Sequence, residues 1–175
     1  MEHMIHEIKP VFNHESKILI LGSFPSVKSR EGHFFYHHPQ NRFWKVLAAC
    51  LGQPVPGTVE EKTIFLLSNH IAVWDVIASC DIQGSSDSSI RNVTPNDLSN
   101  LLALAPVRTI YTNGRTSHKL FHKYLEPSLN REAVKLPSTS PANAAWSLNR
   151  LVSVWGPALR QGLFPGEADR DLTDL

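Results

Sequence analysis

The sequence predicts an α/β fold with three layers, αβα, around a central, mainly parallel four-stranded sheet. Short apolar runs, of the length expected for buried strands, alternate with segments whose apolar residues repeat at helical spacing. No internal repeat interrupts this alternation, and a helix between two consecutive strands favours a parallel crossover. With 175 residues, of which 42% are hydrophobic, the chain is long enough for one domain with a substantial core.

The expected elements of the first half follow from apolar spacing and from residues that begin and end helices. Residues 43–51 place their apolar side chains on one face, and Gly52 is suited to end that helix. Thr58 is suited to cap the next helix, with Glu61 at the capping-box position. The expected order is an irregular lead-in at 1–16, a buried strand at 17–21, a long loop at 22–42, helices at 43–51 and 60–69, and a strand at 71–77.

In the second half, the segment 94–97 (Thr-Pro-Asn-Asp) has the composition of a helix start, with a hydroxyl cap, Pro at the first position and an acid. Residues 1–160 are predicted to form the domain, and residues 161–175 an acidic, mobile tail. The expected order is a Ser- and Gly-rich loop at 81–92, a helix from Thr94 to Ala105, a strand at 107–112, a helix at 114–124, a short strand at 133–136 and a last helix at 142–155.

Composition excludes several classes of protein. No apolar run approaches the roughly 20 residues of a membrane helix, and the N-terminus has no apolar signal region, so we expect no membrane partner. Cys50 and Cys80 match no metal-ligand spacing and are interpreted as free thiols, which predicts a cytoplasmic protein. The histidines lack zinc-ligand spacing, so we expect no metal and no organic cofactor, and we expect a monomer. The net charge of +1 becomes +4 for residues 1–160, a mild bias compatible with one basic face.

The candidate functional site is expected where the strands end. A parallel sheet brings the carboxyl ends of its strands to one edge, and open α/β sheets bind ligands there. The segments placed at this edge are Gly22–Ser26, the loop from Phe34 to Trp44, Asp75 with the Ser/Asp-rich loop after it, Asn113-Gly114-Arg115, and Leu136–Pro141.

Two of these segments suit a nucleic-acid base. The small residues Gly22, Ser23 and Ser26 permit close backbone approach to an anion or a base carbonyl, although an ordinary turn has the same composition. The aromatic run at 34–36 can form a stacking platform for a base, or a hydrophobic plug beneath a long loop.

Asn41 and Asp75 each have a structural and a functional interpretation. Asn41 can cap the helix at 43–51, or its amide oxygen can position a water, since an amide is too weak a base to remove a proton. Asp75 lies in an apolar strand, where a carboxylate needs a partner; it can accept hydrogen bonds from a base edge or anchor the following turn. Arg42 and the hydroxyls at 138–140 suit phosphate, but Arg42 can instead pair with an acid, and the hydroxyls can cap a helix.

Five stretches, in order along residues 18–155, carry a resemblance to a known family. They resemble the uracil-DNA glycosylase superfamily, and most closely its hypoxanthine-excising branch, the DNA-deoxyinosine glycosylases; the Pro-x-Asn-Arg-Phe-Trp element at 39–44 is also similar to the mismatch-specific branch. The stretches are Leu19-Ile20-Leu21-Gly22-Ser23-Phe24-Pro25-Ser26, His38-Pro39-Gln40-Asn41-Arg42-Phe43-Trp44, Trp74-Asp75-Val76 with Asp87-Ser88-Ser89-Ile90, Thr112-Asn113-Gly114, and Leu136-Pro137-Ser138-Thr139-Ser140-Pro141-Ala142-Asn143.

The sequence departs from the superfamily pattern at two positions. Phe24 stands where the first motif often has an Asp or Asn that orients or activates water. Leu136 stands where the second motif often has a His or Asn that stabilises the departing base. The hypoxanthine branch shows both losses, and its catalytic amide matches Asn41, so the resemblance implies Asn41 as the catalytic residue.

The activity implied by the resemblance is that of a monofunctional glycosylase that acts on damaged DNA in base excision repair. The damaged nucleotide is flipped from the duplex, water held by Asn41 attacks C1′, and no Lys is placed for a Schiff base. Hypoxanthine is the expected base, with uracil and xanthine as alternatives. A DNA- or nucleotide-binding module of the same fold and a hydrolase of free nucleosides are the competing interpretations. The predicted base-binding residues are Gly22, Ser23, Phe24, Phe35, Tyr36, Asp75 and Asn113, and the predicted phosphate-binding residues are Ser26, Arg42, Ser138, Thr139 and Ser140.

Overall fold

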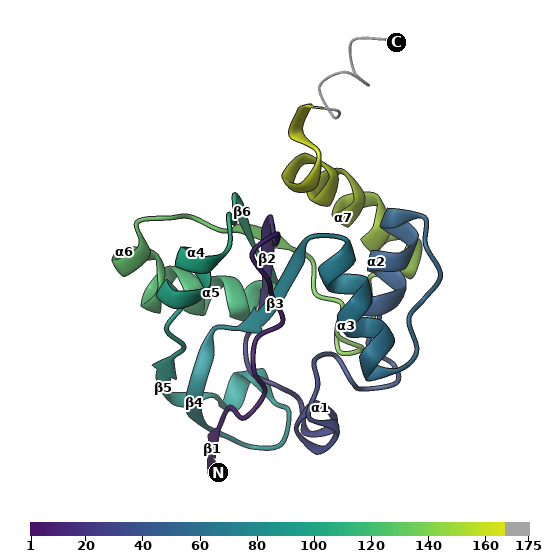
Figure 1. The fold of residues 1–175 in the computed structure, drawn as a ribbon. Helices are drawn as coiled ribbons and strands as arrows, with labels where there is room; N and C mark the ends of the chain where they lie inside the picture. The colour runs from purple at the N-terminus through teal and green to yellow at the C-terminus, as the bar shows by residue number, and fades with distance from the viewer. Residues whose placement is uncertain (167–175) are drawn as a thin grey trace.

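A four-stranded parallel sheet forms the centre of the molecule, in a computed structural model that describes residues 1–166 (Figure 1). Its strands are β2 (Ile18–Gly22), β3 (Ile71–Asp75), β6 (Thr109–Asn113) and β7 (Val134–Leu136). The order β3-β2-β6-β7 places β2 inside the sheet, in parallel register with β3 and β6. This arrangement confirms the predicted fold class.

Helices cover both faces of this sheet. In Figure 1, α2, α3 and α7 lie on one side of the strands, and α4, α5 and α6 lie on the other. Alternate side chains of β2 enter the two resulting cores: Ile20 packs in the cluster of Trp155, and Leu21 packs in the cluster of Phe121. The helices are α2 (Phe43–Leu51), α3 (Val59–Ser68), α4 (Ser99–Leu104), α5 (Arg115–Tyr124), α6 (Glu126–Leu129) and α7 (Leu148–Leu163).

The second sheet is antiparallel, and the sequence does not predict it. Its strands are β1 (Glu2–Ile5), β4 (Ile77–Ile82) and β5 (Arg91–Pro95), in the order β1-β4-β5. Three predictions are therefore wrong: the lead-in contains a strand, the strand predicted at 71–77 divides after Asp75, and the predicted loop at 81–92 holds parts of β4 and β5. β1 and β5 leave most of their side chains exposed, so tertiary pairing rather than apolar pattern decides their conformation.

The helix start predicted at Thr94 is also wrong, because that segment pairs with β4. Asn96 Nδ2 donates to the carbonyl oxygens of Asp75 (2.9 Å) and Ile77 (3.1 Å). These bonds hold the chain in an extended path, and α4 begins only at Ser99.

α7 begins and ends later than predicted. Ser147 caps it, with its Oγ accepting the Arg150 N–H at 3.1 Å. Pro157 lies inside the helix and removes one donor without ending it, and Leu163 packs into the core at its last turn. The helix thus extends past the predicted end of the domain. Residues 167–175, which hold the acids of the predicted tail, lie outside the described residues.

Other elements match the predictions closely. α2 begins and ends where expected, and Gly52 ends it in the left-handed region, at φ 63°. Thr58 caps α3, with its Oγ1 accepting the Glu61 N–H at 3.0 Å. The loop at 22–42 contains a short helix, α1 (Val27–Gly32), that the sequence does not predict.

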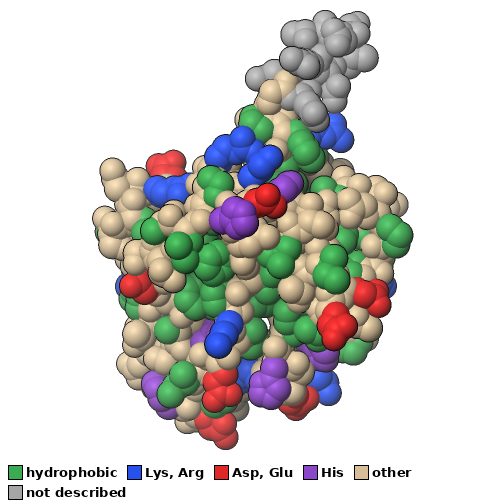
Figure 2. Space-filling view, viewed as in Figure 1, with side chains coloured by type: hydrophobic (Ala, Val, Ile, Leu, Met, Phe, Trp, Pro, Cys, Tyr) green, Lys and Arg blue, Asp and Glu red, His purple; other side chains and the backbone are tan. Residues whose placement is uncertain are grey.

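Charged side chains of both signs are scattered over the face drawn in Figure 2, without a large area of one sign. That face therefore offers no continuous basic surface to a DNA backbone. None of the helices formed by residues 1–166 is both long and apolar enough to cross a bilayer.

Candidate functional site

A cavity of about 340 Å³ opens at the carboxyl edge of the parallel sheet. The segments that follow β2, β3, β6 and β7 form its walls, together with the loop ahead of α2, as the parallel order requires. Its volume lies within the range of small-molecule sites, about 300–1,000 Å³. Among the predicted site residues Arg42 alone does not line it; those that do are Gly22, Ser23, Phe24, Ser26, Phe35, Tyr36, Asn41, Asp75, Asn113, Ser138, Thr139 and Ser140.

Gly22 ends β2 at the corner where these walls come closest. A Cβ at this position would collide with Asp75 Oδ1 and would stand 3.2 Å from Tyr36 Oη. The backbone is fixed there as well, because the Val76 N–H donates to the Gly22 carbonyl oxygen at 2.8 Å. The absence of a side chain on Gly22 therefore lets the carboxylate and the hydroxyl reach the same corner of the cavity.

The aromatic run at 34–36 divides between the core and the cavity wall. Phe34 is the plug, stacked on Trp44 with ring centroids 6.0 Å apart. Phe35 and Tyr36 line the cavity, and the Tyr36 ring stacks on Phe43 at 3.9 Å. Tyr36 has a φ of 49°, a left-handed conformation that costs a bulky residue about 1–3 kcal/mol and is typical of functional sites.

A chain of hydrogen bonds links three predicted residues in the cavity wall. The hydroxyl of the fully buried Thr139 donates to Asn41 Oδ1 at 2.8 Å and accepts from Asn113 Nδ2 at 3.0 Å. The Thr139 N–H donates in turn to Asn113 Oδ1 at 3.0 Å. Asn41 Oδ1 also accepts the Phe43 N–H at 2.9 Å, so Asn41 closes a turn just ahead of α2 while it lines the cavity. The N-cap residue of α2 is Arg42, and the predicted N-cap role of Asn41 is therefore wrong by one position.

The orientation of Asn41 corrects one expectation. Its Oδ1 accepts from a hydroxyl and a backbone N–H, which occupy both lone pairs, so this oxygen does not hold a water as predicted. The backbone N–H of Phe43 also fixes which end of the amide is the oxygen. The Nδ2 group is the end that remains for a ligand, and Asn41 therefore offers hydrogen-bond donors to the cavity.

Arg42 organises the loop after β7 instead of facing the cavity. Its guanidinium donates to the carbonyl oxygens of Ser140 (3.0 Å), Asn143 (3.1 Å) and Trp146. Because three of its five N–H donors bind carbonyl oxygens of this loop and its side chain does not line the cavity, Arg42 lacks the phosphate contact at the cavity that its charge predicts. The same correction applies to Thr139, which is buried and directs both of its donors to side chains of the site.

The three serines predicted to bind phosphate do line the cavity. The hydroxyl oxygens of Ser26, Ser138 and Ser140 accept the backbone N–H groups of Ser29 (3.1 Å), Ser140 (3.1 Å) and Ala142 (3.2 Å). Each serine therefore stabilises a turn or a helix start, as the structural interpretation predicts. The hydroxyl hydrogens of Ser138 and Ser140 have no acceptor among residues 1–166 and stay available to an anion.

A neighbouring groove of about 510 Å³ joins the cavity at the loop after β7 and the N-terminus of α5. Arg115 and Lys135 line it, whereas no Lys or Arg among residues 1–166 lines the cavity itself. The positive charge of these two side chains thus lies beside the cavity. Such a groove suits the phosphates that flank a base held in the cavity.

Within residues 1–166, Asp75 and Asp87 are the two carboxylates that line the cavity, and Asp87 lies in the Ser/Asp-rich loop that the sequence places at this edge without giving that residue a role of its own. Its Oδ1 accepts from Ser23 Oγ at 3.1 Å. Desolvation by the surrounding chain raises the pKa of the Asp87 carboxyl above its ordinary value, against the hydrogen bond from Ser23. Together Asp75 and Asp87 make the cavity suited to a neutral ring and a sugar that becomes cationic. Within residues 1–166, no group of three His, Cys, Asp or Glu side chains could hold a metal ion.

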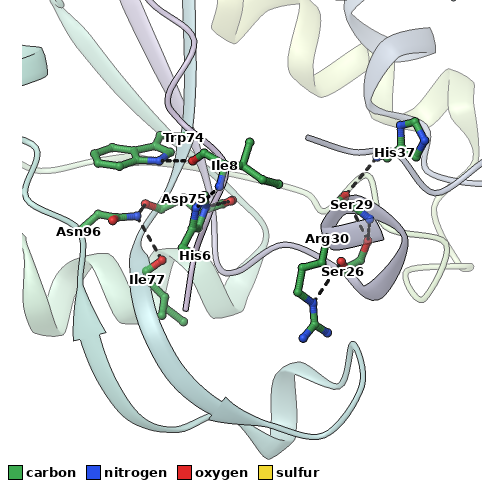
Figure 3. Close-up of polar contacts among 10 residues, drawn as sticks. All are labelled: His6, Ile8, Ser26, Ser29, Arg30, His37, Trp74, Asp75, Ile77 and Asn96. Atoms are coloured by element: carbon green, nitrogen blue, oxygen red, sulfur yellow. Dashed lines mark hydrogen bonds and ion pairs between the residues drawn. The ribbon is translucent and has the colours of Figure 1, made fainter. Parts of the chain in front are cut away.

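The partner of Asp75 is His6, which the sequence does not single out. His6 Nε2 lies 2.8 Å from Asp75 Oδ2, and the two side chains are only 2% and 6% exposed (Figure 3). A carboxylate in an apolar strand requires a partner, so the need for one was predictable. The identity of the partner was not, because His6 lies 69 residues earlier, in a segment expected to be irregular.

Comparison with known proteins gives consistent matches. The sequence model of the "Uracil DNA glycosylase superfamily" matches residues 9–156. A relative named "Hypoxanthine DNA glycosylase", from Methanosarcina acetivorans, is 35% identical over 152 residues, which are 86% of this chain and 94% of the relative. A second relative of that name, from Methanosarcina barkeri, is 30% identical over 154 residues, which are 87% of this chain and 96% of the relative. The solution NMR structure of a candidate uracil DNA glycosylase from Methanosarcina acetivorans superposes with a TM-score of 0.73 at 34% identity, covering 86% of this chain and 94% of that one.

Proposed function

The chain belongs to the uracil DNA glycosylase superfamily, and from this premise we propose that it is a monofunctional DNA glycosylase that releases hypoxanthine in base excision repair. Two relatives at 30–35% identity, matched over nearly their whole length, are named for hypoxanthine. The observation that carries the proposal is the cavity, which presents the Asn41 amide and two carboxylates and, among the residues that the structure describes, is lined by no Lys or Arg. This combination suits a neutral base whose bond to the sugar is being broken.

The substrate must leave the helix to reach this site. The glycosidic bond of a stacked nucleotide is inaccessible, so the nucleotide is flipped into the cavity. Phe35 and Tyr36 form its aromatic wall, and the flanking phosphates lie along the groove of Arg115 and Lys135. The base thus enters a cavity that no Lys or Arg of the described chain lines, while the negative charges of the DNA stay outside it.

The reaction proceeds by loss of the base. The C1′–N bond breaks, its electron pair leaves with the base, and the sugar gains oxocarbenium character that the negative charges of Asp75 and Asp87 stabilise. Asn41 Nδ2 donates to the oxygen of a water and directs the other lone pair of that water toward C1′. The water oxygen bonds to C1′, and the proton that it loses balances the proton that the departing base takes up.

Asn41 carries this role because the other familiar positions of the family hold apolar residues here. Phe24 is 8% exposed and Leu136 is 2% exposed, and both pack in the core. Since no Lys within residues 1–166 lines the cavity, none of these residues offers an amine to form a Schiff base with the sugar. The product is therefore an abasic site in an intact strand.

Base release from end-labelled duplexes tests the proposal. Two duplexes of one sequence hold hypoxanthine opposite thymine or uracil opposite guanine, and mass spectrometry identifies the free base. We expect free hypoxanthine, and strand breaks only after alkali. DNA binding without release of any base would favour the binding-module interpretation. Equal turnover of free deoxyinosine would favour a nucleoside hydrolase.

A further inference from the structure

His6 and Asp75 form a buried pair whose shared proton can be placed. The Ile8 backbone N–H donates to His6 Nδ1 at 3.2 Å, so Nδ1 carries a lone pair. The proton of the neutral ring therefore lies on Nε2, which donates to Asp75 Oδ2 at 2.8 Å (Figure 3). Asp75 is thus an acceptor in this pair, and His6 occupies one of its two oxygens.

Aromatic rings hold His6 in this orientation. Its ring packs against Phe24, Phe35 and Trp74, with centroid separations of 5.9, 6.2 and 6.3 Å. Trp74 Nε1 donates to the Ile8 carbonyl oxygen at 3.2 Å and so fixes the residue whose N–H sets the tautomer. A ring enclosed in this way cannot turn without moving the core. The direction of the carboxylate is therefore set by the tertiary structure.

The second carboxylate oxygen, Asp75 Oδ1, lies in the cavity wall beside an unpartnered donor. No residue among 1–166 donates a hydrogen bond to it. Tyr36 Oη is buried and has no hydrogen-bond partner among the same residues. Burial, reinforced by the negative charge of Asp75, raises the pKa of Tyr36, so its hydroxyl remains protonated and a donor at physiological pH. Both oxygens stand beside Gly22, which places an acceptor and a donor at one corner.

Resting on the proposed function, we propose that Asp75 Oδ1 and the Tyr36 hydroxyl recognise the O=C–N–H edge of a lactam base, with His6 as the positioning residue. Hypoxanthine presents this edge, because its O6 accepts and its N1–H donates. Adenine presents the reverse edge, an amino donor and an unprotonated N1 whose lone pair would face the carboxylate. A site built to bind an N–H rejects an analogue without it by roughly 10⁴–10⁵-fold, because the buried polar groups are left unpaired.

The substrate class is therefore the bases with a ring N–H next to a carbonyl group, which includes hypoxanthine, xanthine and uracil. Deamination converts an amino group and an unprotonated ring nitrogen into this carbonyl and N–H edge. Asp75 and Tyr36 would therefore distinguish the product of deamination from its parent base. Guanine also has a lactam edge, but its intact pair with cytosine opposes flipping.

The substitution Asp75→Asn tests this recognition, because His6 dictates how the amide would lie. The Nε2–H of His6 needs an acceptor, so the amide oxygen would turn toward His6 and the NH₂ group toward the cavity. The acceptor of the cavity would then become a donor, which matches an unprotonated ring nitrogen. We expect the rate ratio between hypoxanthine and unsubstituted purine to fall roughly 100-fold or more. A purely structural role would lower both rates together.

Matched duplexes provide the measurement. Single-turnover release is compared for hypoxanthine and for purine, which lacks both O6 and the N1 proton, each opposite thymine. His6→Phe removes the donor to Asp75, and His6→Gln retains an N–H at similar reach. We expect the selectivity ratio to fall about 10-fold or more in His6→Phe and to recover in His6→Gln. Melting curves establish whether each variant is folded. If His6→Phe does not fold, the selectivity ratio of Asp75→Asn alone tests the proposal.

Two outcomes separate this inference from the proposed function. If wild type releases hypoxanthine, but Asp75→Asn and His6→Phe lower both rates by one common factor, the recognition pair is overturned and the glycosylase assignment stands. If wild type itself releases no hypoxanthine, the assignment falls first.

Discussion

Replacing Thr139 with Val would break the hydrogen-bond chain that orients Asn41 with almost no change in shape. Val keeps the branched side chain of this fully buried position but has no hydroxyl. Asn113 Nδ2 would lose its acceptor at 3.0 Å, and Asn41 Oδ1 would lose a donor at 2.8 Å. The Phe43 N–H would then hold the Asn41 amide from one side alone.

The size of the effect follows from these lost contacts. A hydrogen bond contributes about 1 kcal/mol, and a buried polar group without a partner costs about 1–3 kcal/mol, so the free energy of unfolding should fall by roughly 2–3 kcal/mol. In a domain of this size, each kcal/mol lowers Tm by about 2–4 °C. A catalytic group displaced by about 1 Å costs roughly 100-fold in rate, so we expect hypoxanthine release to slow by about 10- to 100-fold.

The assay is single-turnover release of hypoxanthine with enzyme in excess, below the melting temperature of every variant. Thr139→Ser is the matched control, because it keeps the hydroxyl and should keep most of the rate. Calorimetry supplies Tm for the same preparations. A Thr139→Val protein that is less stable but releases hypoxanthine at the wild-type rate would refute the role of this chain in catalysis.

Other contacts give independent tests. Gly22→Ala brings a Cβ against the cavity carboxylate, so we expect calorimetry to show a loss of about 1–3 kcal/mol and hypoxanthine release to be nearly abolished. Gly156→Ala is the matched control: its Cβ would lie at an ordinary 3.8 Å from its nearest neighbour, and Gly156 is inside α7, so this variant should be no less stable than wild type. Equal losses of stability in Gly22→Ala and Gly156→Ala would contradict the predicted clash. In Arg42→Lys, the ammonium group cannot bind three carbonyl oxygens in the same way as the guanidinium, so amide hydrogen exchange should quicken at 138–146 and hypoxanthine release should fall about 10-fold. Unchanged hydrogen exchange at 138–146 would argue against the role of Arg42 in holding this loop. Burial raises the pKa of the Cys50 thiol to about 11, which leaves less thiolate at any given pH. Its alkylation by iodoacetamide at pH 8 should therefore be on the order of 100-fold slower than that of free cysteine, and an equal rate would contradict the burial.

The parallel sheet was predictable because its strands are buried on both faces and appear as continuous apolar runs, such as Ile18 to Leu21. Once the strands are parallel, topology alone brings their ends to one edge, so the position of the site followed. The antiparallel sheet was not predictable in this way. β1 is mostly exposed, and its pairing, with Ile5 opposite Ser79, joins segments far apart in the sequence.

Within the site, the sequence predicted which residues meet but not how they are oriented. The Asn41 amide oxygen is held locally by the Phe43 N–H, but its second donor is the hydroxyl of Thr139, 98 residues away. The charge of Arg42 suggests phosphate, but the carbonyl oxygens that occupy it come from a loop more than ninety residues later. His6 carries no motif, and its role appears only when the fold places it against Asp75. Orientation and partner choice are tertiary properties, and local patterns do not encode them.

The catalytic role of Asn41 is tested most directly by single-turnover release of hypoxanthine from one duplex by wild type, Asn41→Ala and Asn100→Ala. Asn100 is an exposed residue of α4 and serves as the matched control. Removal of one preorganised donor typically costs about 10²–10³-fold, so Asn41→Ala should be slower by that factor, while Asn100→Ala should match wild type. Loss of the hydrogen bonds from Phe43 and Thr139 should lower the stability of Asn41→Ala by roughly 2–3 kcal/mol, so the assay is run below its measured melting temperature. A folded Asn41→Ala protein that releases hypoxanthine at the wild-type rate would contradict the account.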